Sequence, residues 1–273
     1  MRLTTVLLLS ALLGITGCAS KPKVSPERTE AGQYQAAQRQ IEKKNFLTAV
    51  DELRELEARF PYGDYAEQGL LDLVYVYYRA YDYPASIAAA TRFLRNYPAN
   101  PHLDYVLYMR GLGNYNLERG LFERLLRTEK SSRDLDAWRD AFRDLNELVR
   151  RYPDSPYTPD ARARLVHIRN TMADGELHAA RYYARRGAYV AAAARAKEVI
   201  IHYQETPAVE EALAVQYRAY RALGEKQLAD TTLSVLKYNW PESQYLASND
   251  RVVLPWWPDR ERGLLSLLTF DLL

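Results

Sequence analysis

A pattern recurs five times along the chain: a small residue is followed, twelve residues later, by a proline or once by a glutamine, and an aromatic residue stands directly before that position. The pairs are Ala49 and Pro61, Ser86 and Pro98, Ala141 and Pro153, Ala192 and Gln204, and Ala229 and Pro241. A small residue lets two helices approach closely, and a proline cannot continue a helix. Between them, apolar residues recur at helical spacing, as in Val50, Leu53 and Leu56. Each occurrence predicts the second helix of a helix pair.

The five units resemble the 34-residue tetratricopeptide (TPR) repeat. Successive unit ends lie 37, 55, 51 and 37 residues apart, so two units are longer than the repeat. We expect an insertion near residues 118–134 and a long helix from about Thr158 to Arg186. Because each helix pair has an apolar face that it cannot bury alone, the units must stack. The sequence predicts an all-α superhelical solenoid of about five TPR-like pairs over residues 30–241, followed by a partly ordered C-terminal extension, residues 242–273. An irregular helical bundle is the alternative.

The first residues have the features of an export signal. Arg2 precedes an apolar run, which ends in Ile15-Thr16-Gly17-Cys18. The small residues before the only cysteine resemble a bacterial lipobox, with residues 1–17 as signal peptide, Cys18 as the lipidated residue and 18–29 as a tether. An ordinary signal peptide with a chance cysteine is the alternative. Ala19, in place of the aspartate that commonly retains lipoproteins in the inner membrane, favours a lipid anchor at the periplasmic face of the outer membrane.

The sequence shows little sign of catalytic chemistry. Its four histidines form no H-E-x-x-H pattern, no G-x-S-x-G elbow exists, and one cysteine makes a structural zinc site improbable. A net charge of +2 does not indicate nucleic-acid binding. We interpret carboxylate pairs such as Glu210 and Glu211 as solvated helix surface. We therefore expect no metal, no cofactor and no enzymatic activity, although a Ser-His-Asp arrangement is not excluded by sequence.

Several stretches together are similar to one family, the BamD lipoproteins of the β-barrel assembly (BAM) machinery. They are Phe60-Pro61-Tyr62-Gly63 with Tyr65-Ala66-Glu67-Gln68, Leu71 to Tyr78, Asp104 to Leu112, Leu148 to Ser155, and Ala180 to Tyr183 with Arg186 to Tyr189. The resemblance covers roughly residues 15–240. It implies a periplasmic scaffold that binds the POTRA region of BamA and the lipoprotein BamC and receives unfolded outer-membrane proteins. The C-terminal extension is longer than the family's common pattern. A TPR lipoprotein that coordinates cell-wall synthesis with envelope constriction is the alternative.

Tyrosine is unusually abundant, at 22 residues against 6 phenylalanines, and it suits both helix seams and binding grooves. In a TPR solenoid the first helix of each pair lines the concave face. Counting along the repeat predicts that a substrate groove contains Tyr34, Tyr75, Tyr78, Arg79, Tyr105 and Tyr108. Barrel proteins end in an aromatic residue with a free carboxylate, which the rings and Arg79 would hold. The alternative is that these tyrosines only fill the seam between helices.

Two further segments are candidates for contact with partners. In this family the C-terminal repeats are expected to dock BamA, and Arg195 and Lys197 interrupt an alanine-rich helix there. We predict that Arg195 contacts BamA, because the guanidinium fork pairs with carboxylates at two points; a solvated arginine is the alternative. Trp256, Trp257 and the leucine-rich end form an apolar segment that could cap the last repeat or touch lipid or a partner.

Overall fold

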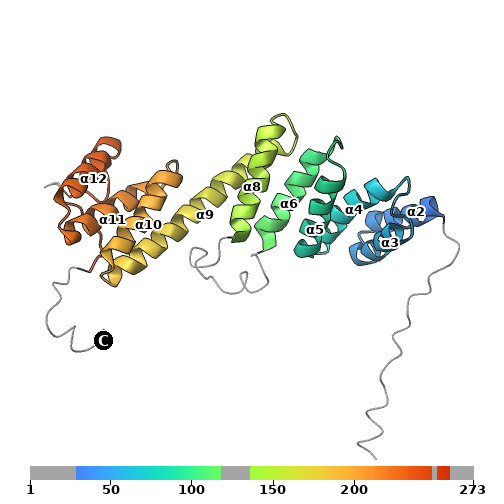
Figure 1. The fold of residues 1–273 in the computed structure, drawn as a ribbon, viewed down its shortest axis with the longest axis horizontal. Helices are drawn as coiled ribbons and strands as arrows, with labels where there is room; N and C mark the ends of the chain where they lie inside the picture. Colours follow the sequence, from blue (N-terminus) through green and yellow to red (C-terminus); the bar gives the residue numbers. More distant parts are fainter. Residues whose placement is uncertain (1–28, 118–135, 248–250, 259–273) are drawn as a thin grey trace, which may run out of the picture.

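The computed structural model describes residues 29–117, 136–247 and 251–258, and within them it contains ten α-helices and no strand (Figure 1). The helices are α2 (Glu30–Glu42), α3 (Phe46–Arg59), α4 (Ala66–Arg79), α5 (Tyr83–Asn96), α6 (Leu103–Leu117), α8 (Asp136–Arg151), α9 (Thr158–Arg185), α10 (Tyr189–His202), α11 (Ala208–Leu223) and α12 (Lys226–Asn239). They follow one another along an elongated molecule, so that each helix packs mainly on its neighbours in sequence. The predicted all-α solenoid is confirmed.

The five small residues of the repeat lie where the second helix of each pair crosses the first. They are all fully buried: Ala49 on α3, Ser86 on α5, Ala141 on α8, Ala192 on α10 and Ala229 on α12. Ser86 satisfies its hydroxyl by donating to the carbonyl of Val74 on the facing helix, at 2.8 Å. A larger side chain at these positions would push the helices of the pair apart, which explains why the sequence repeats a small one.

In each pair, the second helix ends directly before the aromatic residue of the pattern. The N–H of each aromatic residue donates to the carbonyl four residues earlier. The carbonyl of the same aromatic residue accepts from the N–H three residues later. The residues are Phe60, Tyr97, Tyr152, Tyr203 and Trp240. Gln204 follows Tyr203 in the same turn, so the turn forms without proline at that position.

The turn between the two helices of a pair has a backbone feature that the sequence did not predict. In four units it contains one residue in the left-handed backbone region: Lys44 (φ 60°), Tyr81 (φ 63°), Gly187 (φ 74°) and Gly224 (φ 80°). Only the two glycines carry a sequence signal for this conformation, because glycine adopts it without strain. The corresponding turn of the third unit, and the predicted insertion near 118–134, lie outside the described residues.

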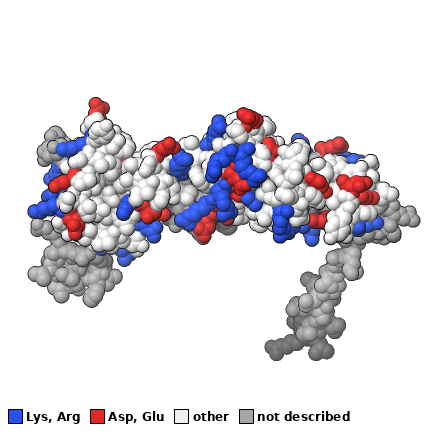
Figure 2. All heavy atoms as spheres, turned by 45° about the horizontal axis from the view of Figure 1, so that its top comes forward, with Lys and Arg blue, Asp and Glu red and all other residues white. Residues whose placement is uncertain are grey.

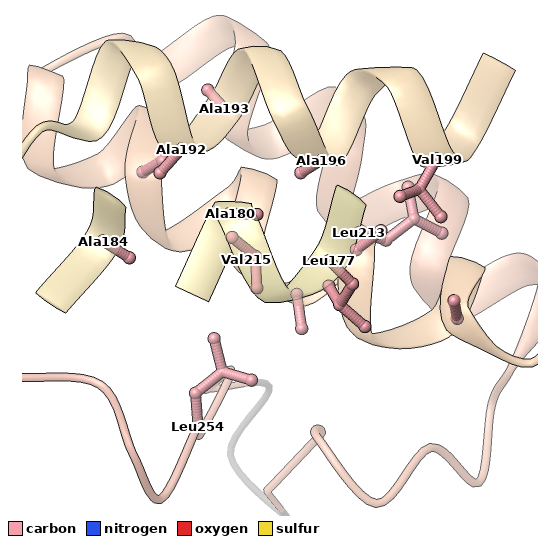
Figure 3. Packing of buried hydrophobic residues seen from close by; sticks show 14 of the residues in the cluster. Leu177, Ala180, Ala184, Ala192, Ala193, Ala196, Val199, Leu213, Val215 and Leu254 are labelled. Atoms are coloured by element: carbon pink, nitrogen blue, oxygen red, sulfur yellow. The ribbon is translucent and has the colours of Figure 1, made fainter. Parts of the chain in front are cut away.

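The long helix α9 joins two parts of the solenoid. Its first half, with Ala161, Leu165 and Ile168, packs in a core with α8, and its second half packs under α10 and α11. Figure 3 shows Leu177 and Ala180 of this second half facing the alanine-rich side of α10. The predicted helix from Thr158 is therefore present and ends at Arg185. None of the described helices is long and apolar enough to cross a membrane.

Candidate binding surface

The six residues predicted to line a groove lie on the first helices of three successive units. Together with Tyr65 and Tyr157, which precede α4 and α9, the tyrosines form a set that we call the tyrosine row. Its members are Tyr34, Tyr65, Tyr75, Tyr78, Tyr105, Tyr108 and Tyr157. Each is half-buried, so one side of the ring packs on the helices while the rest reaches the surface.

At the N-terminal end of the row, Tyr34 stacks on Tyr65 with ring centroids 4.6 Å apart. The hydroxyl of Tyr34 donates to Asp72 Oδ2 at 3.0 Å, and Gln38 and Gln68 donate to the same carboxylate. Burial raises the pKa of Asp72 above its ordinary value, and the three donors oppose that rise. Burial and the nearby Asp72 raise the pKa of Tyr34, so its hydroxyl stays a proton donor. At this end of the row, the carboxylate of Asp72 therefore accepts hydrogen bonds from three neighbouring side chains.

In the middle of the row, Arg79 lies over two aromatic rings. Its guanidinium carbon is 4.6 Å from the ring centroid of Phe46 and 5.5 Å from that of Tyr75, and Nη1 donates to the hydroxyl of Tyr75 at 2.6 Å. Arg79 is exposed, and no carboxylate among the described residues forms an ion pair with it. A guanidinium held over aromatic faces is oriented while its charge remains available to an anion.

At the far end, Tyr105 and Tyr108 pack on Tyr157, with centroids 5.5 Å and 4.9 Å apart. The hydroxyl of Tyr108 donates to Asp160 Oδ2 at 2.8 Å, and Arg164 binds the same carboxylate. Burial and the hydrogen bond to Asp160 raise the pKa of Tyr108 to about 12. Although burial opposes it, the hydrogen bonds from Arg164 and Tyr108 hold the pKa of Asp160 below its ordinary value.

The sequence predicted the first helices correctly but did not indicate the residues that the tyrosines of the row contact. Asp72 and Asp160 accept the tyrosine hydroxyls, and Tyr65 and Tyr157 provide the stacking rings. The sequence does contain a pattern that could have predicted Tyr65 and Tyr157. Each stands five residues after the aromatic residue that closes the preceding helix pair. The hydroxyl of Tyr78 accepts from Asn116 at 3.1 Å, and burial raises the pKa of Tyr78.

Arg195 and Lys197 lie apart from the tyrosine row, on the second helix α10. Arg195 Nη1 lies 2.9 Å from Glu176 Oε2 of α9, and the two side chains are 46% and 13% exposed. Lys197 is exposed. The structure therefore gives Arg195 an internal role, as the partner of a mostly buried carboxylate, which the sequence did not indicate.

The interpretation of Glu210 and Glu211 as solvated surface was wrong. Glu211 is only 8% exposed, and it accepts two hydrogen bonds from Arg181, at 2.7 and 2.6 Å, and one each from Tyr245 and Trp256, both at 3.0 Å. Glu210 accepts from the hydroxyl of Ser243 at 2.6 Å. Glu211 is covered and Glu210 is half-buried because residues 243–247 and 251–258 fold back onto α11, and the sequence around position 210 contains no sign of that cover.

Comparisons with known proteins show the family of this chain. Residues 26–236 match the family described as YfiO, outer membrane lipoprotein. The chain belongs to the YfiO family. The outer membrane protein assembly factor BamD of Neisseria meningitidis serogroup A is 37% identical over 92% of this chain and 97% of its own length. That of Vibrio cholerae is 36% identical over 85% and 97%. Among solved structures, MamA aligns with 83% of this chain and 98% of its own, at a TM-score of 0.40 and 14% identity.

The YfiO match contains the whole tyrosine row, Arg195 and Lys197. Cys18 and the whole C-terminal extension, residues 242–273, lie outside it, and Cys18 also lies outside the described residues. The resemblance to BamD proteins that the sequence motifs indicated is thereby confirmed.

Charge is mixed over the described surface of this YfiO chain. In Figure 2 basic atoms gather over the middle of the molecule, where α8 lies. Most of these arginines have acidic neighbours on the same helix: Arg139 pairs with Asp136, Arg143 with Asp140 and Arg151 with Glu147. In this part of the described surface, neighbouring carboxylates therefore compensate these three arginines. Among the described residues, no group of acidic residues, histidines or cysteines could hold a metal ion.

Proposed function

We propose that this chain is a non-enzymatic scaffold lipoprotein of the BAM complex, held at the periplasmic face of the outer membrane, which binds BamA and assists the folding and insertion of β-barrel proteins. The observation that carries the proposal is the identity of 37% with an outer membrane protein assembly factor BamD over 92% of the chain. The alternative scaffold, for cell-wall synthesis during constriction, gains no support from the YfiO match. BamC and other BAM lipoproteins are further expected partners.

The tyrosine row is the surface that we assign to unfolded barrel proteins. A barrel protein's terminal aromatic side chain would pack against the half-buried rings, which gain from offset or edge contacts with another aromatic residue. Its terminal carboxylate would pair with Arg79, whose guanidinium is oriented by Phe46 and Tyr75 and has no carboxylate partner among the described residues. One end of a peptide would thus be fixed by charge and the adjoining residues by stacking.

Peptide binding tests this assignment. The probe is a peptide that copies the C-terminus of a barrel protein, and binding is measured by fluorescence anisotropy. Replacing Tyr75 and Tyr78 together by alanine should weaken binding while circular dichroism remains helical. Arg79→Gln should weaken binding of the free-acid peptide but not of the same peptide with an amidated C-terminus. Tyr62→Ala is the matched control, because Tyr62 is 98% exposed and lies outside the row. Loss of helicity in step with binding would mean that the rings serve only as core.

The partner and the anchor are tested separately. A pull-down from solubilised envelopes should recover BamA; recovery of peptidoglycan synthases instead would favour the alternative scaffold. Cys18→Ala should abolish incorporation of a palmitate analogue, because the thiol is the proposed site of lipid attachment. Label that persists in the Cys18→Ala chain would contradict the anchor.

A further inference from the structure

The segment after α12 begins like another repeat and then departs from it. The N–H of Ser243 donates to the carbonyl of Trp240 at 3.1 Å, and that of Leu246 donates to the carbonyl of Ser243 at 3.0 Å. The same two bonds, at 3.1 and 3.0 Å, link Tyr152, Ser155 and Thr158 where α9 begins. No helix follows Leu246 in the described residues. Instead, residues 251–258 return, and Val252 pairs with Leu246 in an antiparallel bridge.

Residues 251–258 are not helical, so they do not form the first helix of a sixth unit. Their burial alternates as it does along a strand: Val252 is fully buried, Val253 is 43% exposed and Leu254 is 5% exposed. Figure 3 shows Leu254 beneath α9 and α11, on the side opposite α10. Like most of the tyrosine row, which lies on the first helices α2, α4 and α6, this contact is made with first helices of their pairs.

Three kinds of contact hold the segment, and each is one that a protein uses to bind a peptide. Leu254 and Trp257 enter the apolar core that α9, α10 and α11 share, and the ring of Trp257 is stacked 5.6 Å from that of Tyr189, the first residue of α10. Arg218 Nη1 reaches the backbone carbonyl of Val252 at 3.4 Å, and its guanidinium lies 5.4 Å from the ring of Trp257. Glu211 accepts from the indole N–H of Trp256.

We propose that α9 and α11, together with Tyr189 at the start of α10, form a second peptide-binding surface, which residues 251–258 occupy as an intramolecular ligand. When the segment leaves, the surface accepts an extended aromatic peptide with apolar side chains at alternate positions from another chain. The tether explains why the surface is closed in the intact protein, because a ligand on the same chain acts at an effective concentration of the order of millimolar. A free peptide of ordinary affinity cannot compete with it.

The test keeps the whole chain and cuts it once. A protease recognition sequence replaces residues 248–250, and cleavage frees residues 251–273 from the tether. The probe is a fluorescein-labelled peptide of residues 251–258, and anisotropy is measured with cut and uncut protein. Two probe variants form a matched pair: Leu254→Ala removes a buried side chain and Val253→Ala an exposed one at the next position. A scrambled peptide of the same composition controls for non-specific stickiness.

We expect saturable binding to the cut protein and none to the uncut protein. Leu254→Ala should weaken the probe by on the order of tenfold, the range found for buried contact residues, while Val253→Ala should leave it nearly unchanged. Glu211→Gln in the cut protein should also weaken the parent probe. If the cut protein loses helicity when the fragment departs, or keeps a fragment that never exchanges with the probe, the segment is a permanent structural cap and the proposal is wrong. Equal binding to uncut protein would overturn it as well.

Discussion

Arg110 of α6 forms a two-point ion pair with Asp144 of α8, with Nε 3.0 Å from Oδ2 and Nη2 2.7 Å from Oδ1. The side chain of Asp144 is fully buried, and Asn114 donates a third hydrogen bond to it at 3.1 Å. Burial raises the pKa of Asp144, and the guanidinium and amide donors oppose that rise. The pair joins the two helices of the third unit, on either side of residues 118–135, so it fixes how they meet.

Replacing Asp144 by alanine should lower the free energy of unfolding by about 3 kcal/mol, because Arg110 would keep its charge in a mostly buried position without its partner. Urea unfolding followed by circular dichroism measures the change. The matched control is Glu147→Ala on the same helix, which breaks the exposed pair with Arg151 and should cost less than about 1 kcal/mol. A double variant with apolar residues at 110 and 144 should recover much of the loss. Equal effects of Asp144→Ala and Glu147→Ala would contradict the prediction.

Gly111 is a second test of the same helix contact. A Cβ at this position would lie 2.7 Å from Cδ2 and 2.8 Å from Cγ of Leu145, a fully buried residue that has little room to move. Gly111→Ala should therefore destabilise the protein by about 1–3 kcal/mol, although alanine favours a helix more than glycine does. In Gly113→Ala the new methyl meets Ile87, which is only half-buried and can shift, so we expect a smaller loss. Thermal unfolding of both variants ranks them, and a more stable Gly111→Ala would show that Leu145 does move.

The features that could be predicted from the sequence are those that each repeat determines locally. A small residue such as Ala192 is needed wherever two helices cross, and an aromatic residue such as Tyr152 closes each unit, so both recur at fixed spacing. The burial of Glu211 could not be predicted. The groups that cover it include Trp256, which lies 45 residues later in a segment that does not follow the repeat pattern. The left-handed backbone at Tyr81 also lacked a signal, since non-glycine residues rarely adopt it.

The raised pKa of Tyr108, in the tyrosine row, should make the free energy of unfolding depend on pH in alkaline solution. The pKa of Tyr108 is raised from 10.0 to about 12, so the folded protein holds this proton more tightly than the unfolded chain. The stabilisation is fully present below pH 10 and is lost as the pH rises toward about 12. Tyr108→Phe, which has no proton to lose, should show a smaller decline in the free energy of unfolding across this interval. Urea titrations at several pH values measure both slopes, and identical slopes would mean that Tyr108 ionises as easily in the folded state.

Because Arg195 binds Glu176 inside the chain, a single substitution at 195 does not separate an internal role from contact with BamA. Arg195→Glu would set two carboxylates against each other, and Glu176 is only 13% exposed. Exchanging the two residues, with Arg195→Glu and Glu176→Arg together, keeps an internal ion pair while it reverses the charge that α10 presents. We predict that the exchanged protein folds but binds BamA less tightly by about 2 kcal/mol or more, as expected for a buried charged contact.

Co-purification from solubilised envelopes, followed by titration of purified BamA, measures this loss. Arg162→Glu, the same charge change at an exposed position of α9, is the control and should leave BamA binding unchanged. Lys197→Glu tests the second predicted contact on α10. If the exchange restores the BamA binding that Arg195→Glu alone removes, Arg195 acts by holding Glu176 in place, and its assignment to the interface is wrong.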